Sequence, residues 1–360
     1  LRVGYLSPVF RTHPVARFML PLLKAHDRDR VTVYAYADVA KPDAMTRQLE
    51  SVTDEWRNVT GMTDADLADC VAADELDILI DLAGHTQGHR LGVLARRPAP
   101  ITATCLGYPN TTGLTRVAWR ITDAVADPSD APTPGSETLV RITGGMSCYA
   151  PPEDAPPINA LPALASGHVT FGSLAKAAKL NDQLLGLWAR VLHATPGARL
   201  LIARDDLTAR ARSRITTTLA RQGIDESRVT LDAPPAGESP LASYHRIDIS
   251  LDTWPYAGHT SVCDALWMGV PVVTLRGDTA RSRMGAAVLA EADCEAWIAE
   301  DADGYVAVAA ALAGDLDALS RHRAVLRDRV AGARLTDGRA FAAAFEHALL
   351  AAWRQRQPSG

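Results

Sequence analysis

DISLDTWPYAGHTSVCDALWMGVPVVTL, residues Asp248 to Leu275, is the most informative stretch of this chain. Ile249 and Leu251 predict a short buried strand, and the apolar residues at 262, 265, 266 and 268 recur at helical spacing. A Gly-His-Thr-Ser turn at 258–261 separates these two elements, and an apolar strand begins again near residue 270. The segment therefore predicts a strand, a turn, a helix and a second strand.

The turn at 258–261 opens a helix at the carboxyl end of a strand. Free backbone N–H groups and the positive end of the helix dipole make this position suitable for an anion such as a diphosphate. Thr260 and Ser261 can add hydroxyl donors. The alternative is that both hydroxyls only cap a helix of the core, because every α/β protein has such turns.

Composition limits the classes of protein and partner. A chain of 360 residues exceeds what one hydrophobic core usually serves, so we expect two domains. The net charge of -5 and the pI near 6.1 argue against a nucleic acid or an anionic membrane as partner. No apolar run is long enough to span a bilayer, and the N-terminus reads as a strand rather than a signal sequence. The five widely spaced cysteines read as reduced core residues of a cytoplasmic protein.

A proline-rich stretch from Tyr149 to Pro162 divides the chain. On each side short apolar strands alternate with helical patterns, which predicts an α/β fold of two doubly wound, Rossmann-like domains that face a cleft. The expected parts are an N-terminal domain at 1–150, a linker at 151–165, a C-terminal domain at 166–335, and a C-terminal helix and tail at 336–360. The expected strands lie near 2–7, 31–36, 77–81, 101–106, 118–122, 168–173, 199–204, 228–231, 248–251 and 270–275.

Only four of the 37 basic residues are lysines, and two of them, Lys176 and Lys179, stand three residues apart. They precede a helix that we expect to begin at Asn181. In a chain that prefers arginine, a compact ammonium group suits a place where a phosphate is bound. The alternative is a chance pair on an exposed turn.

Three kinds of chemistry can be compared with these residues. A dinucleotide oxidoreductase is disfavoured, because the turn after the first strand has no G-x-G-x-x-G. A metal-dependent transferase would place a carboxylate pair on a loop, but Asp64-Ala-Asp66 and Asp301-Ala-Asp303 both open amphipathic helices, so we expect no metal. Metal-free transfer from an activated sugar remains, and it needs a charged cradle and a base.

Two histidines are candidate bases for that transfer. His13 and His85 each follow a strand at its carboxyl end and would point into the cleft, although a loop histidine can also be structural. Lys179 and the turn at 258–261 form the candidate cradle for the leaving diphosphate. Other histidines, such as His26, His168, His193 and His347, lie on expected helices or at strand starts and are expected to have no special role.

The chain resembles the catalytic region of the O-GlcNAc transferase and SPINDLY family of protein O-glycosyltransferases along nearly its whole length. GYPNTTG and the GHT at His85 are most similar to the SPINDLY branch, whereas GHTS at 258–261 is more similar to the O-GlcNAc transferase branch. The matching segments are LRVGYLSP with THPV (1–15), DILIDLAGHT (77–86), LARRPAPI and LGYPNTTG (94–113), RITD with ADP (120–128), VTFGSLAKAAKLND (169–182) and DISLDTWPYAGHTSVCDALWMGVPVVTLRGD (248–278).

This resemblance implies a GT-B fold and an inverting, metal-independent transfer of a sugar from a nucleotide diphosphate to Ser or Thr of a protein or peptide. It implies no cofactor, since the nucleotide sugar is a co-substrate. It places the acceptor on the N-terminal domain and the donor on the C-terminal domain. The residues that it assigns are His13 near the attacking hydroxyl, Lys179 at the diphosphate, His259, Thr260 and Ser261 as donors to the diphosphate and sugar, Asp264 at the ribose, and Leu106 and Gly107 along the sugar pocket.

The sequence departs from the family pattern in two places. Ser239-Pro240-Leu241 stands where relatives carry a histidine that stacks on the base, and Gly237 stands where they carry a lysine. Ahead of Lys179, Ala175 and Lys176 replace polar amides, so Lys176 is a candidate to supply the charge that Gly237 lacks.

We therefore expect a cytoplasmic protein O-glycosyltransferase with UDP-GlcNAc as the first choice of donor. One alternative is a protein O-fucosyltransferase of the SPINDLY type that uses GDP-fucose. A second alternative is a degenerate transferase that only binds a nucleotide or a partner. Relatives of this family commonly carry N-terminal tetratricopeptide repeats that select protein substrates, and such repeats would lie outside residues 1–360.

Overall fold

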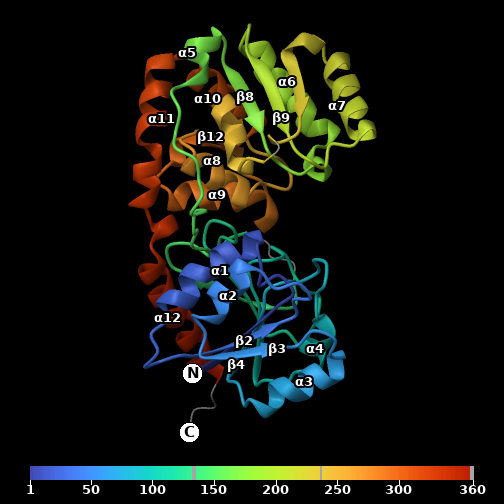
Figure 1. Cartoon of the computed structure of the whole chain (residues 1–360), viewed down its shortest axis with the longest axis vertical. Coiled ribbons are helices and arrows are strands. Elements are labelled where there is room, and N and C mark those ends of the chain that lie inside the picture. Colours follow the sequence, from blue (N-terminus) through green and yellow to red (C-terminus); the bar gives the residue numbers. More distant parts are fainter. Residues whose placement is uncertain (132–134, 236, 357–360) are drawn as a thin grey trace. The chain divides into compact units, whose positions relative to one another are not determined.

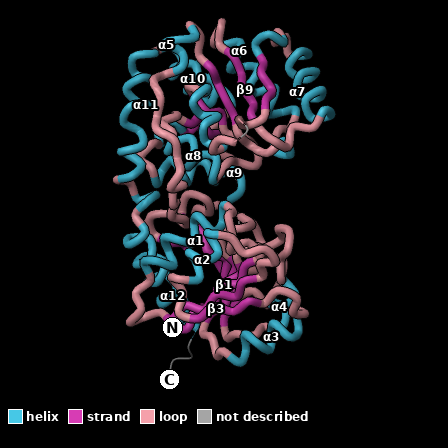
Figure 2. The backbone as a smooth tube through the Cα atoms, viewed as in Figure 1, coloured by secondary structure: helices cyan, strands magenta, loops and turns pink. Residues whose placement is uncertain are grey.

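The computed structural model describes residues 1–131, 135–235 and 237–356 (Figure 1). The chain divides into two compact units. Unit 1 comprises Leu1–Ala150 and Arg334–Gly360, and unit 2 comprises Pro151–Ala333. In each unit, helices flank the strands of one parallel sheet (Figure 2). No described helix combines the length and the apolar character that a bilayer crossing requires.

Within the described residues, unit 1 contains a sheet of seven parallel strands in the order β3-β2-β1-β4-β5-β6-β7. The central strands β1 and β4 are almost entirely buried, as expected for strands that helices cover on both faces. The strands are β1 (Arg2–Ser7), β2 (Thr32–Ala37), β3 (Glu55–Asn58), β4 (Ile78–Asp81), β5 (Ile101–Thr104), β6 (Trp119–Asp123) and β7 (Thr138–Ile142), and the helices are α1 (Pro14–Ala25), α2 (Ala44–Glu50), α3 (Asp64–Ala73), α4 (Leu91–Arg96), η5 (Arg334–Thr336) and α12 (Gly338–Arg356).

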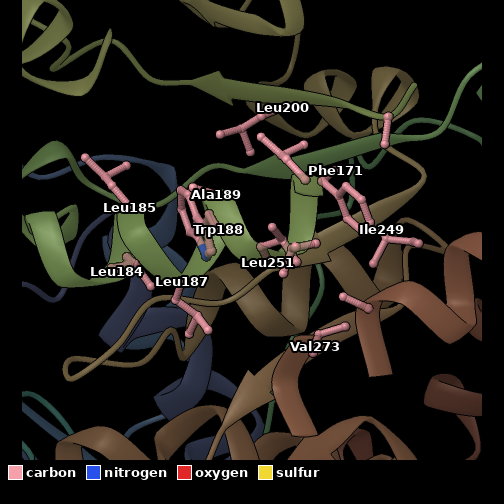
Figure 3. Close-up of a cluster of buried hydrophobic side chains, with 14 of the residues drawn as sticks. Phe171, Leu184, Leu185, Leu187, Trp188, Ala189, Leu200, Ile249, Leu251 and Val273 are labelled. Carbon is pink, nitrogen blue, oxygen red and sulfur yellow. The ribbon is translucent and has the colours of Figure 1, made fainter. Parts of the chain in front are cut away.

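Unit 2 has six described strands in the order β10-β9-β8-β11-β12-β13, again all parallel. Its core cluster includes Trp188 of α6 together with side chains of the sheet such as Phe171, Ile249 and Val273 (Figure 3). The strands are β8 (Thr170–Ser173), β9 (Arg199–Ala203), β10 (Val229–Asp232), β11 (Ile249–Leu251), β12 (Val272–Leu275) and β13 (Ile298–Ala299). The helices are α5 (Pro162–Ser166), η1 (Ala177–Lys179), α6 (Asp182–Ala194), α7 (Ala209–Arg221), η2 (Glu226–Arg228), η3 (Pro240–Arg246), α8 (Thr260–Trp267), α9 (Ala280–Glu291), η4 (Glu295–Trp297), α10 (Ala302–Gly314) and α11 (Leu316–Ala331).

The two sheets share one topology, since β3-β2-β1-β4-β5-β6 corresponds to β10-β9-β8-β11-β12-β13. The strand order reverses between β1 and β4 in unit 1, and between β8 and β11 in unit 2. Ligands of open α/β sheets bind outside the carboxyl ends of the strands at such a reversal. The loops after β1, β4, β8 and β11 are therefore the expected places for ligand-binding residues.

All ten predicted strands are present, and the predicted α/β class with two doubly wound sheets is confirmed. The sequence missed β3, β7 and β13, which are the outer strands of their sheets. These strands are short or only partly buried, so their residues do not form the apolar runs by which the inner strands were found. The two D-x-D triplets also lie at helix starts as predicted, with α3 beginning at Asp64 and Asp301 capping α10.

The proline-rich stretch is bound to unit 2. The carbonyl oxygen of Pro156 accepts a hydrogen bond of 2.8 Å from Arg327, and that of Pro157 lies 2.8 Å from Nε2 of His245. Asn159 donates to the carbonyl of His245 and accepts from Nε of Arg323 through its own carbonyl at 3.0 Å. This part of the expected linker is therefore held by side chains, and α5 occupies its end.

The C-terminal helix α12 belongs to unit 1, where it runs beside α1 (Figure 1). Nδ1 of the buried His26 lies 2.8 Å from Oε1 of Glu346 on α12, and Nε2 of His26 lies 2.8 Å from the hydroxyl of Tyr5 on β1. The backbone N–H of Asp27 donates to the same Glu346 oxygen at 2.9 Å. His26, which was expected to have no special role, thus joins the last helix to the first strand.

Candidate donor site in unit 2 and candidate base residues in unit 1

Asp252, the residue after β11, organises the loop that leads to α8. Its side chain is buried, with Oδ1 accepting from the backbone N–H groups of Thr253 (2.8 Å) and Gly258 (2.7 Å). Oδ2 accepts from the hydroxyl of Thr274 on β12 at 2.8 Å. A Cβ atom at position 258 would lie 2.5 Å from Oγ of Ser261 and 2.7 Å from Oδ1 of Asp252, so only glycine fits there. The carboxylate therefore determines where the chain enters α8.

The start of α8 has the properties of an anion site. His259 is the N-cap residue and makes no capping hydrogen bond with its side chain, and Thr260 and Ser261 are the first two helical residues. Neither residue is therefore the N-cap of α8, and their binding of an anion stays a prediction. Among the described residues, no hydrogen-bond partner is found for the backbone N–H groups of Thr260 and Ser261. Unpaired N–H groups at a helix start are able to bind an anion. Tyr244 of η3 fixes this turn by donating to the carbonyl of Ser261 at 2.8 Å.

Lys179 lies beside this helix start. It ends η1 in the loop after β8, and its Nζ donates to the carbonyl of Ala257 at 2.8 Å and lies 3.9 Å from the centre of the Tyr256 ring. Burial lowers the pKa of Lys179, the Asp252 carboxylate opposes that shift, and the Lys176 ammonium adds to it. The next residues are tied to the same loop, because Nδ2 of Asn181 donates to the carbonyl of Trp254 at 2.8 Å. The loops after β8 and β11 thus present an ammonium group next to free N–H donors.

The other predicted donor residues of unit 2 lie on the same two loops and on α8. Burial, together with the Lys179 ammonium, lowers the pKa of His259 to about 3, so its ring is neutral at pH 7 and can only act as a neutral donor or acceptor. Lys176 is exposed on the loop after β8, and Asp264 is half-buried one turn into α8. Their roles toward a nucleotide remain predictions.

In unit 1, His13 follows β1 and caps α1. Its Nδ1 accepts a hydrogen bond of 3.2 Å from the backbone N–H of Val15, so a neutral His13 ring carries its proton on Nε2. His85 follows β4 and is exposed, with Nε2 2.9 Å from the carbonyl oxygen of Thr112. A carbonyl oxygen can only accept, so Nε2 of His85 carries the proton and Nδ1 carries the lone pair. The two candidate bases therefore contact the backbone through different ring nitrogens, Nδ1 in His13 and Nε2 in His85.

Leu106 and Gly107 follow β5, the neighbour of β4. Leu106 has a φ of +66°, a strained value for a leucine that is typical of functional loops. A Cβ atom at Gly107 would collide with the carbonyl oxygen of Leu82, so the loops after β4 and β5 pack directly on each other. The ring of the next residue, Tyr108, lies edge-on to His85 with centroids 5.2 Å apart. The predicted sugar-pocket residues and His85 are thus neighbours in unit 1.

Three residues of these loops were not predicted from the sequence, namely the buried Asp81 and Asp252 and the histidine His89. Asp81 corresponds to Asp252, because its Oδ2 accepts from the backbone N–H of Gly84 at 2.6 Å and from the hydroxyl of Thr104 on β5 at 3.3 Å. A detectable signal was the repeat of Ala-Gly-His-Thr at 83–86 and 257–260, each time after an aspartate that ends or follows a strand. His89, four residues after His85, also escaped notice, and its ring centroid lies 6.1 Å from that of His85. In the described part of the chain no three His, Cys, Asp or Glu side chains are grouped to hold a metal ion.

We predict that Asp81 makes stability depend on pH between about 4 and 6. Burial raises its pKa to about 6, against hydrogen bonds from Gly84 and Ala83 that lower it. In this window the folded chain keeps a proton that the unfolded chain has released, so stability is lost as the pH rises through it. Relative to Asp81→Asn, the native protein should lose on the order of 3 kcal/mol of unfolding free energy between pH 4 and pH 7. Urea unfolding of both proteins at several pH values measures this, and parallel curves would contradict it.

Comparison with known proteins agrees with this geometry. Residues 1–145 and 160–345 match the sequence family described as glycosyl transferase family 41. The Arabidopsis thaliana protein named probable UDP-N-acetylglucosamine--peptide N-acetylglucosaminyltransferase SPINDLY is 39% identical over 99% of this chain and 40% of its own length. The protein of the same name in Solanum lycopersicum is 37% identical over 99% of this chain and 39% of its own length. The chain therefore spans about two fifths of the length of these curated relatives.

Solved structures support the same assignment of the fold. A mutant of the Thermobaculum terrenum O-GlcNAc transferase matches 99% of this chain and 68% of its own length, with a TM-score of 0.91 and 36% identity. The lipopolysaccharide outer core galactosyltransferase WaaB is only 10% identical, with a TM-score of 0.58, 98% of this chain and 100% of that chain being covered. The predicted GT-B fold, with its two doubly wound sheets, is confirmed.

Proposed function

Because the chain belongs to glycosyl transferase family 41, we propose that it transfers a sugar from a nucleotide diphosphate to a Ser or Thr hydroxyl of a protein. In this proposal the reaction inverts the anomeric carbon and needs no metal ion. The hydroxyl oxygen bonds to the anomeric carbon while the bond from that carbon to the diphosphate breaks. The hydroxyl proton goes to a base, and the nucleotide diphosphate leaves with the bonding electrons.

The observation that carries this proposal is the position of Lys179 beside the start of α8. Its Nζ reaches the carbonyl of Ala257, three residues before Thr260, whose N–H has no described partner. Negative charge grows on the diphosphate as the sugar bond breaks, and preorganised donors aimed at that charge stabilise the transition state. A half-buried ammonium and a helix N-terminus together supply such donors without a metal ion.

The acceptor side of the proposal rests on unit 1. His13 and His85 stand after β1 and β4, the strands between which the order of the sheet reverses. Since Nδ1 of His13 accepts from Val15, its neutral ring carries the proton on Nε2, whereas His85 has a lone pair at Nδ1 to which no described residue is hydrogen-bonded. We propose that His13 orients the attacking hydroxyl and that His85 is the better placed of the two to accept a proton.

The donor is proposed to be UDP-GlcNAc, since the relatives' names specify UDP-N-acetylglucosamine, with GDP-fucose as the alternative. Calorimetric titration in buffer with a chelator should show that UDP binds more tightly than GDP. Asp264→Asn is a matched control. Both nucleotides carry the ribose that Asp264 is proposed to contact, so this substitution should weaken the binding of UDP and of GDP and leave the ratio of the two affinities unchanged. Tight GDP binding without UDP binding would contradict the first choice and favour the fucose donor.

The segment proposed to recognise the nucleobase is the one that departs from the family pattern. Ser239 and Pro240 precede and open η3, and Tyr244 of the same short helix holds the carbonyl of Ser261. The segment that departs from the family pattern is therefore attached to the helix start proposed to bind the diphosphate. A change there can alter nucleotide preference while Lys179 and α8 keep their contacts.

A further inference from the structure

Glu137 stands just before β7 and gathers the loop at 111–112. Its Oε2 accepts from the hydroxyl of Thr111 at 2.7 Å, and its Oε1 accepts from the backbone N–H of Thr112 at 2.6 Å and from the Thr112 hydroxyl. The side chain is buried, with 9% of the residue exposed. Burial alone would raise the pKa of Glu137, but the hydrogen bonds from Thr112 and Thr111 outweigh it and hold the pKa below its ordinary value. Glu137 is therefore a carboxylate at neutral pH, with its oxygens used by this loop.

The same loop determines the protonation of His85. Glu137 accepts from both the N–H and the hydroxyl of Thr112. The carbonyl of Thr112 in turn accepts from Nε2 of His85 at 2.9 Å. On its other side the His85 turn is held by Asp81 through Gly84, and the Tyr108 ring meets the imidazole edge-on. No described residue is hydrogen-bonded to Nδ1, and the residue is exposed. The ring is thus fixed at Nε2 and open at Nδ1.

We propose that Glu137 is a positioning residue, which acts through Thr112 to hold His85 in the tautomer whose Nδ1 accepts the proton of the acceptor hydroxyl. A carboxylate, an intervening peptide and an imidazole form this relay, in which Glu137 itself exchanges no proton. Proton transfer to Nδ1 leaves an imidazolium whose Nε2–H still donates to Thr112, so the positive charge is stabilised by the carbonyl dipole. This second step rests on the proposed transferase function, whereas the tautomer does not.

The tautomer can be measured without any activity. Two-bond ¹H–¹⁵N correlation spectra of the ¹⁵N-histidine-labelled chain distinguish protonation at the two ring nitrogens, and His85→Gln assigns the signals. We expect His85 of the native chain to carry its proton on Nε2, and Glu137→Gln to give a mixture of tautomers. Ser136→Ala is the matched control, because its hydroxyl donates to the carbonyl of Leu114 and not to the relay. A native His85 protonated on Nδ1, or a Glu137→Gln spectrum identical to the native one, would overturn the relay.

The kinetic arm tests what the relay is used for. With far-ultraviolet circular dichroism unchanged, Glu137→Gln should lower kcat by about tenfold or more and leave the donor KM unchanged. A change in the donor KM alone, or an unchanged kcat together with an altered tautomer, would overturn the role of His85 as base. If Glu137→Gln does not fold, Thr112→Val tests the same relay, since it removes the hydrogen bonds of the Thr112 hydroxyl with Glu137 and with the N–H of Leu114 but keeps the Thr112 N–H and carbonyl. The native spectrum still decides the tautomer.

Discussion

Replacement of Lys179 by alanine is expected to lower kcat for sugar transfer by about 10²–10³-fold, which corresponds to about 3–4 kcal/mol of lost transition-state stabilisation. Nζ of Lys179 lies 2.8 Å from the carbonyl of Ala257, within reach of a diphosphate bound at the start of α8. Its partial burial keeps water from screening the charge as fully as at an exposed site. The measurement is the rate of sugar transfer from the nucleotide sugar to protein acceptors.

A matched control is present three residues away. Lys176 carries the same charged group on the same loop but is exposed, so Lys176→Ala should cost less than about tenfold, as for other solvated charges. An unchanged rate for Lys179→Ala would remove this residue from the mechanism. Absence of transfer in both the native chain and Lys179→Ala would favour a module that binds a nucleotide or a partner without catalysis.

The second large effect is expected from Asp252→Ala. The substitution leaves three buried donors without an acceptor, namely the N–H groups of Thr253 and Gly258 and the hydroxyl of Thr274. A buried donor without a hydrogen-bond acceptor is destabilising, so we expect the unfolding free energy to fall by about 3–5 kcal/mol. We also expect nucleotide binding to be lost, because the loop would no longer keep its shape. Urea unfolding followed by circular dichroism measures the first effect, and calorimetry with the nucleotide measures the second.

Asp252→Asn separates the acceptor role of this residue from its charge. An amide oxygen can still accept from Thr253 and Gly258, and the amide nitrogen can donate to the hydroxyl oxygen of Thr274. We therefore expect Asp252→Asn to be nearly as stable as the native chain. If the unfolding free energy of Asp252→Ala were also within about 1 kcal/mol of that of the native chain, the loop would not depend on this carboxylate.

The sequence predicted ten strands and the starts of several helices because those signals are local. Inner strands such as β4 and β12 are largely runs of buried apolar residues, and caps such as Asp301 stand beside the helices that they begin. The edge strands β3 and β7 offered no such run. The attachment of α12 to unit 1 depends on His26 and Glu346, which are 320 residues apart, and no local pattern predicts such a pair.

The candidate site shows the same division. Lys179 and the turn at 258–261 were proposed from short motifs, and the structure places Nζ of Lys179 against the residue that precedes this turn. The role of Glu137 was not predictable, because it depends on a contact with Thr112 across 25 residues and on which ring nitrogen of His85 that loop holds. Motifs indicate which residues take part, whereas the partners that set their protonation come from the packing of loops.

The most direct test of the donor site is a crystal structure of the chain soaked with UDP in the presence of a chelator. We expect diphosphate oxygens within about 3 Å of the backbone nitrogens of Thr260 and Ser261 and of Nζ of Lys179. Such a structure would also show which residues near Pro240 contact the base. Well-ordered UDP bound elsewhere, with its diphosphate away from Lys179 and the start of α8, would contradict the proposed mechanism.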